Sequence, residues 1–180
     1  MLLPPKRHLA LTFHLYTASN FVWSSAVPNP NQANSALTHY IHFGPIVNQN
    51  LRVVSSLLTQ IFTEPAFNVL RTQEQLGYIV ICSSWLLPGG ADKGLRIVVQ
   101  GEKTPGYLEE RVEAFLDGMK TTIETMNDEV FSEQRSSLEK KWLEADKTLA
   151  DEHARFGTQV NSGHWDFLRS TFSAWLRPFI

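Results

Sequence analysis

The sequence has a single cysteine, Cys82, among its 180 residues, so no intrachain disulfide can form and a reducing compartment is favoured. An excess of charge of one sign is also lacking, because 18 acidic residues offset 16 basic ones. Without a basic excess to neutralise phosphates, nucleic-acid binding is not expected. No apolar run approaches the roughly 20 residues that a membrane-spanning helix needs. We therefore expect a soluble, cytoplasmic protein that binds neither nucleic acid nor membrane.

Histidine pairs with the spacing of a hydrolytic zinc site are absent as well. Such sites place two histidines on one helical face, four residues apart and beside a glutamate, and no two of the six histidines have this spacing. His39 and His42 are three apart on an expected strand, which points them to opposite faces. Cys82 has no histidine next to it in sequence to activate its thiol. We predict that the chain has no catalytic residues of its own and binds no metal or other cofactor.

The residues that are present predict an ordered series of strands and helices. Prolines and asparagines indicate an irregular arm over residues 1–35. Beyond the arm, the hydrophobic residues recur at the period of a strand in some segments and of a helix in others. The expected elements are a strand over 37–43, a helix over 48–63 that Pro65 ends, a short helix over 66–71, strands over 76–82 and 95–100, a helix from Thr104-Pro105 to Met126, a helix capped by Asn127 whose apolar stripe reaches Leu149, and a helix over 151–161.

This order of elements predicts an α+β fold. Two strands separated by Pro88-Gly89-Gly90 favour an antiparallel hairpin. The nearly unbroken apolar run over 76–82 suits a central strand, and the amphipathic helices need a hydrophobic surface to cover. We therefore expect an antiparallel sheet packed on one face by long helices.

A polar segment that ends in Gly-Tyr before an apolar strand is the candidate functional site. It consists of Arg71-Thr72-Gln73-Glu74-Gln75-Leu76-Gly77-Tyr78. An arginine and a tyrosine at this spacing could both donate hydrogen bonds to one extended peptide. The alternative is an arginine paired with a glutamate and a tyrosine on a sheet edge, and composition alone favours this second interpretation.

The same segment resembles a known family of peptidases. The likeness is carried by Phe67-Asn68-x-Leu70-Arg71-Thr72-x-Glu74-Gln75-Leu76-Gly77-Tyr78-Ile79-Val80, by Lys93-Gly94-Leu95-Arg96 and by Tyr107-Leu108-Glu109-x-Arg111-Val112-Glu113-Ala114-Phe115-Leu116. These stretches are similar to the last C-terminal domain of the insulysin/pitrilysin-type zinc metallopeptidases. The likeness extends over roughly residues 20–165.

This resemblance implies a fold and a role. In the family, homologous α+β domains form two halves that close around a chamber, and zinc and the His-x-x-Glu-His motif lie in the first domain. The last domain supplies an arginine and a tyrosine to the substrate backbone, which match Arg71 and Tyr78 here, with Gln75 and Gly77 in support. The resemblance thus implies a substrate-binding domain that is inactive alone. Its implied partners are a peptide substrate and the zinc-bearing catalytic half of an insulysin-like metalloendopeptidase.

The two ends depart from the family pattern. We divide the chain into a divergent arm over 1–19, the insulysin-like domain over 20–165 and a divergent tail over 166–180, whose apolar residues indicate a short amphipathic helix. The family continues into another helix and a closing strand at this point, so the chain looks truncated. An open sheet edge would favour homo-oligomers. A freestanding peptide-binding or protein-interaction module, or an inactive truncated product, are the alternative interpretations.

Overall fold

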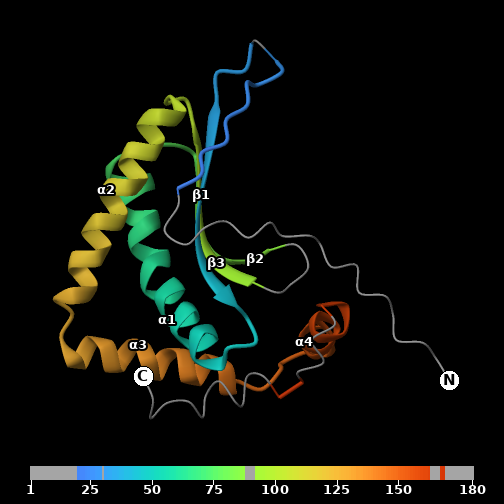
Figure 1. Cartoon of the computed structure of the whole chain (residues 1–180). Helices are drawn as coiled ribbons and strands as arrows, with labels where there is room; N and C mark the ends of the chain where they lie inside the picture. Colours follow the sequence, from blue (N-terminus) through green and yellow to red (C-terminus); the bar gives the residue numbers. More distant parts are fainter. Residues whose placement is uncertain (1–19, 30, 88–91, 163–166, 169–180) are drawn as a thin grey trace.

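The protein is described here by a computed structural model, in which residues 20–29, 31–87, 92–162 and 167–168 are placed. Within this part a sheet lies beside a layer of helices (Figure 1), which confirms the α+β class. The elements are β1 (Ser35–Pro45), α1 (Gln49–Ala66), the π-helix η1 (Phe67–Gln73), β2 (Ile79–Leu86), β3 (Asp92–Gly101), α2 (Pro105–Glu124), α3 (Asp128–Leu143) and α4 (Leu149–Ser162).

The sheet has the strand order β1-β3-β2, and both pairs are antiparallel. The predicted hairpin of β2 and β3 is therefore confirmed. The prediction of a central strand over 76–82 is wrong, because β3 is the central strand and β2 begins only at Ile79. The apolar run serves two purposes: Leu76 packs into the core before the strand starts, and β2 itself buries only alternate residues such as Val80 and Cys82.

Helices α1 and α2 cover one face of the sheet (Figure 1), as predicted. The central strand presents its inward residues to this layer, and they are almost completely inaccessible to solvent. Phe62 of α1 meets Phe115 of α2 edge to face, with ring centroids 6.1 Å apart. Such burial is the main stabilising contribution to a domain of this size. The central residues of this core are Leu70, Leu76, Leu95, Ile97, Val99, Leu108 and Val112.

Helix α1 does not end at Pro65, contrary to the sequence-based prediction. Pro65 lies inside the helix, and the chain continues without a break into η1, where the separate short helix over 66–71 was expected. A proline within a helix costs about 3 kcal/mol because it lacks an N–H and crowds the preceding turn. Burial offsets this cost, since Phe62, Ala66 and Leu70 lie four residues apart and all pack into the core.

The predicted helix starts at Thr104-Pro105 and Asn127 are confirmed. The Thr104 side chain accepts a hydrogen bond from the backbone N–H of Tyr107, and the Asn127 side chain accepts one from Val130. Each cap satisfies an N–H group that the first turn of a helix leaves without a partner. These short-range signals therefore fix where α2 and α3 begin.

The stripe expected to run from Asn127 to Leu149 is divided between two helices. Helix α3 ends at Leu143, because the backbone of Glu144 is extended. Leu138 is the buried residue of α3, so the later part of the stripe has little core to pack against. The helix predicted over 151–161 is confirmed as α4.

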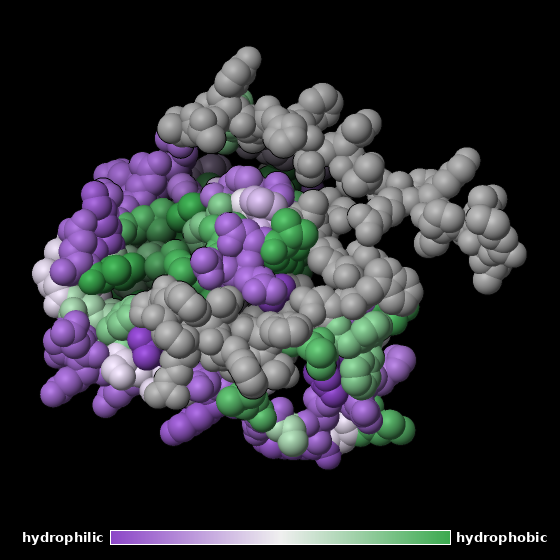
Figure 2. Space-filling view, turned by 60° about the horizontal axis from the view of Figure 1, so that its bottom comes forward, coloured by the Kyte–Doolittle hydropathy of each residue, from purple (hydrophilic) through white to green (hydrophobic). Residues whose placement is uncertain are grey.

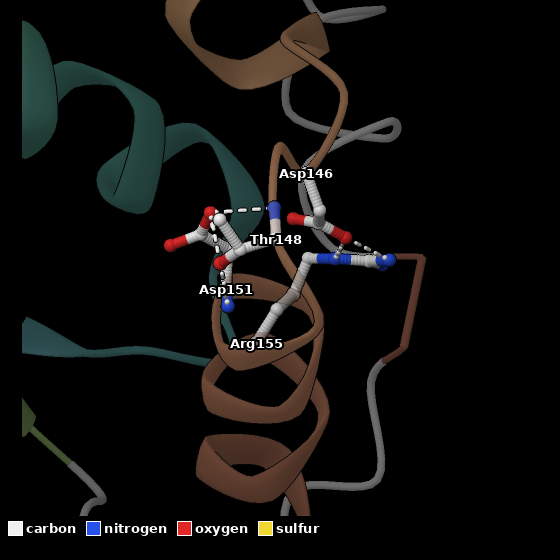
Figure 3. Close-up of polar contacts among 4 residues, drawn as sticks. All are labelled: Asp146, Thr148, Asp151 and Arg155. Carbon is white, nitrogen blue, oxygen red and sulfur yellow. Dashed lines mark hydrogen bonds and ion pairs between the residues drawn. The ribbon is translucent and has the colours of Figure 1, made fainter.

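Local polar contacts join the linker after α3 to the first turns of α4 (Figure 3). Thr148 and Asp151 form a reciprocal cap, in which Thr148 N–H donates to Asp151 Oδ2 at 3.0 Å and Asp151 N–H donates to Thr148 Oγ1 at 3.2 Å. Arg155 then reaches back to Asp146, with its Nη2 2.7 Å from Asp146 Oδ2. These contacts give α4 its own start after the interruption.

Some hydrophobic side chains lie outside the core. In the view of Figure 2, hydrophobic residues line a hollow that hydrophilic residues border.

Within the described part of the chain, no helix has the length and apolar character needed to cross a membrane. The helix predicted in the tail over 166–180 and the loop at Pro88-Gly89-Gly90 lie outside the described residues, except for Phe167 and Leu168.

Candidate functional site

The candidate site is built on the turn that connects η1 to β2. The π-helix closes with a hydrogen bond from Glu74 N–H to the carbonyl of Val69 at 2.9 Å. A second bond, from Leu76 N–H to the carbonyl of Leu70 at 3.0 Å, joins two residues that are fully buried. The turn is therefore anchored at both ends in the core. Short π-helical segments are frequent at functional sites.

The backbone after η1 has two special features. Gln75 adopts a positive φ of 52°, which is uncommon for a residue other than glycine. Gly77 crosses the end of β3 so closely that a Cβ atom would lie 2.0 Å from the carbonyl oxygen of Gln100. A Cβ on Gly101 would meet the carbonyl oxygen of Leu76 at 2.2 Å. The two predicted supporting residues, Gln75 and Gly77, therefore shape the path of the chain between Arg71 and Tyr78.

Arg71 and Tyr78 lie together, as the sequence analysis anticipated. The Arg71 guanidinium carbon is 5.3 Å from the centre of the Tyr78 ring and 4.9 Å from the centre of the Phe67 ring. Stacking of this type is favourable, because the face of an aromatic ring attracts a cation. Tyr78 is 83% exposed, so it is open to a binding partner. Phe67 belongs to the quoted motif but was not singled out as a site residue.

A hollow of about 650 Å³ is present at this position. Arg71, Gln75, Gly77 and Tyr78 all line it, so the structure brings the four predicted residues to one surface. The rest of the lining comes from the arm before β1, the turn between η1 and β2, the start of β2, the end of β3 and the turn toward α2. These residues are Asn34, Leu76, Ile79, Gln100, Gly101, Glu102 and Lys103.

Sequence reasoning missed the residues at the end of β3. The predicted hairpin could have identified these residues, because antiparallel pairing of β2 with β3 sets Ile79 opposite Gln100. The residues that follow Gln100, including Lys103, must then lie beside the start of β2. Asn34 gave no comparable signal in the sequence.

Glu74 pairs with an arginine other than Arg71. Arg111 of α2 donates from Nε to Glu74 Oε2 at 2.8 Å and from Nη2 to Glu74 Oε1 at 2.7 Å. The hydrogen bond to Glu74 and the charge of its carboxylate raise the pKa of Arg111. The alternative interpretation, an arginine of this segment paired with a glutamate, is therefore wrong for Arg71. That interpretation came close for Tyr78, which directly precedes the edge strand β2.

Other ionisable groups form no metal centre in the part of the chain that the structure describes. No three histidine, cysteine, aspartate or glutamate side chains gather there closely enough to hold an ion. His42 Nε2 lies 3.0 Å from Asp92 Oδ2, which makes only a pair. Burial raises the pKa of Cys82 to about 11, so its thiol is protonated at neutral pH. The described residues thus do not fit a zinc ion.

Comparison with known proteins identifies the domain. Residues 57–157, more than half of the chain, match the family model described as PQQ synthase PqqF-like, C-terminal lobe domain 4. The chain belongs to this family. It is a C-terminal domain of the insulysin/pitrilysin type of zinc peptidase, as the motif around Arg71 and Tyr78 indicated.

Relatives of this insulysin-type domain are much longer proteins. The human insulin-degrading enzyme is 43% identical over 63% of this chain and 11% of its own length. The A-factor-processing enzyme of Saccharomyces cerevisiae is 31% identical over 87% of this chain and 15% of its own length. The crystal structure of pitrilysin superposes with a TM-score of 0.69 at 25% identity, over 83% of this chain and 16% of that chain. The chain therefore spans less than a fifth of the length of each.

Proposed function

We propose that this domain binds an extended peptide in the hollow beside η1 and β2, and that Arg71 and Tyr78 donate hydrogen bonds to the peptide backbone. Cleavage is carried out by a separate zinc-bearing domain of an insulysin-like metalloendopeptidase. The observation that carries the proposal is that both donors, which are seven residues apart in sequence, line one hollow.

The chemistry of the two side chains fits this role. The Arg71 guanidinium is always protonated, so it offers only donors, and the Tyr78 phenol offers an O–H. When a peptide bond is attacked, negative charge develops on its carbonyl oxygen, and donors fixed in advance stabilise that charge. The stack of Arg71 on the rings of Tyr78 and Phe67 supports such fixing. The domain would therefore bind and orient the peptide and add donors to one side of it.

The first test is hydrolysis of insulin B chain by a separately produced zinc-bearing half of an insulysin-like enzyme, with and without this chain. One relative degrades insulin, which makes this peptide a suitable probe. We expect the chain to stimulate cleavage. Tyr78→Phe should reduce the stimulated rate by about two orders of magnitude, because removal of one such donor costs ~3 kcal/mol of barrier.

Tyr107→Phe is the matched control, since Tyr107 is also exposed but does not line the hollow. It should leave the stimulation unchanged. If a folded chain does not stimulate cleavage but binds the peptide through Arg71, a freestanding peptide-binding module becomes the better assignment. Identical binding by the wild type, Arg71→Ala and Tyr78→Phe would show that the proposed site is wrong.

A further inference from the structure

The ion pair of Glu74 and Arg111 connects the candidate site to helix α2. Glu74 is the first residue after η1, and Arg111 lies 37 positions further along the chain. Both carboxylate oxygens are engaged, at 2.8 Å and 2.7 Å. A bidentate arginine–carboxylate pair fixes orientation as well as distance, because the two planar groups must face each other. Glu74 therefore has a defined direction relative to α2.

The pair acts on the segment that presents both donors. Glu74 lies three residues after Arg71 and four residues before Tyr78. Its backbone N–H also closes the last turn of η1, on the carbonyl of Val69. Rotation of the chain at Glu74 would therefore move the end of η1, which carries Arg71, and Tyr78, which directly precedes β2.

The pair is partly exposed, so its contribution to stability is modest. The Arg111 side chain is 35% exposed and that of Glu74 is 20% exposed. Water screens part of the attraction between these charges, so even a bidentate pair here adds only modestly to the free energy of folding. The core residues on either side, Leu70 and Leu76, keep the segment folded without it. Loss of the pair should thus change the geometry of the site more than the stability of the domain.

We propose that Glu74 and Arg111 are positioning residues, which hold the turn between η1 and β2 so that Arg71 and Tyr78 face the same peptide. This inference rests on the proposed function of the hollow. Neither residue of the pair lines the hollow, so they act through the turn and not by contact with the peptide.

The test measures the affinity of the full chain for fluorescently labelled insulin B chain by anisotropy. Glu74→Gln and Arg111→Gln keep side chains of similar size and remove the ion pair. Each should weaken binding about tenfold, which corresponds to ~1.4 kcal/mol, with a melting temperature close to that of the wild type. In an Arg71→Ala background the same changes should weaken binding less than they do in the wild type, because one of the two positioned groups is already gone.

The ion pair of Asp146 and Arg155 supplies a matched control (Figure 3). It belongs to α4 and the linker before it, and α4 lies away from the end of α1 that continues into η1 (Figure 1). Asp146→Asn should leave the affinity unchanged. An equal loss in the wild-type and Arg71→Ala backgrounds, or no loss in either, would overturn the positioning role.

Failure of the proposed function is separable from failure of this inference. If Arg71→Ala itself has no effect on binding, the hollow is not the peptide site. In that case, nuclear magnetic resonance of the chain without peptide tests the positioning role. Glu74→Gln should shift the ring protons of Tyr78 and the Nε–H of Arg71, since the stack at 5.3 Å would be altered. Unchanged resonances would overturn the inference.

Discussion

Gly77 shows how one residue decides the geometry of the candidate site. A Cβ there would lie 2.0 Å from the oxygen and 2.6 Å from the carbon of the Gln100 carbonyl. Both atoms belong to the backbone of the central strand, so they cannot move aside as the end of a flexible side chain would. This close crossing places the next residue, Tyr78, at the edge of the hollow. The sequence motif contains this glycine, but its neighbour across the strand is known only from the fold.

We predict that Gly77→Ala lowers the free energy of unfolding by about 2 kcal/mol or more, because the added methyl group forces the two backbones apart. Gly118→Ala is the matched control: Gly118 lies in α2, and nothing lies within 4 Å of its added Cβ. That change should raise the free energy of unfolding by about 0.5–1 kcal/mol, since alanine is the better helix former. Urea unfolding of both variants measures the difference. Similar stabilities would contradict the close crossing.

The individual residues of the site differ in how far sequence could predict them. Arg71 and Tyr78 were singled out because the motif that contains them resembles the family, whereas composition alone favoured the alternative. The partner of Glu74 was not found, because Arg111 is 37 residues away and composition does not say which arginine reaches which carboxylate. The positive φ of Gln75 had no signal either, since glutamine is not typical of that conformation.

Among the elements, the passage from α1 into η1 is where sequence rules failed most instructively. Proline is expected to end a helix, and Pro65 does not. The apolar spacing of Phe62, Ala66 and Leu70 prevails, because all three face one core. The π-helix that follows brings Leu70 inward and leaves Arg71 at the surface of the hollow.

We predict that Leu70→Ala lowers the free energy of unfolding by about 3 kcal/mol, the usual cost of removing a fully buried leucine side chain and leaving a cavity. Val54→Ala tests the opposite face of α1, where Val54 is 48% exposed, and should cost less than about 1 kcal/mol. Thermal and urea unfolding give both values. If both substitutions lower the free energy of unfolding equally, core packing does not explain why the helix continues past Pro65.

For the molecule as a whole, the edge of the sheet at β2 offers a surface for association. Within the described residues β2 pairs only with β3, and Ile79, Ile81 and Trp85 are each about two-fifths exposed. A strand with a free edge and exposed apolar residues favours pairing with another chain. The homo-oligomers hypothesised from sequence are untested by the fold and stay a prediction.

We expect sedimentation velocity to detect dimers or larger oligomers as the concentration rises. Ile81→Lys should shift the population toward monomer, because a charge on the exposed side of an edge strand opposes pairing. Val130→Lys introduces the same charge on α3, at a residue of similar exposure, and should have no such effect. A single monomer boundary for the wild type at every concentration would contradict self-association.

The sequence by itself determined the α+β class, the antiparallel hairpin, the caps at Thr104 and Asn127, and the motif that holds Arg71 and Tyr78. Each of these depends on a short stretch of chain, where hydrophobic period and capping chemistry act locally. The tertiary structure alone decided that β3 is central, that α1 passes Pro65 and that Arg111 holds Glu74. These outcomes depend on which surfaces meet across long separations, where burial and pairing outweigh local preference.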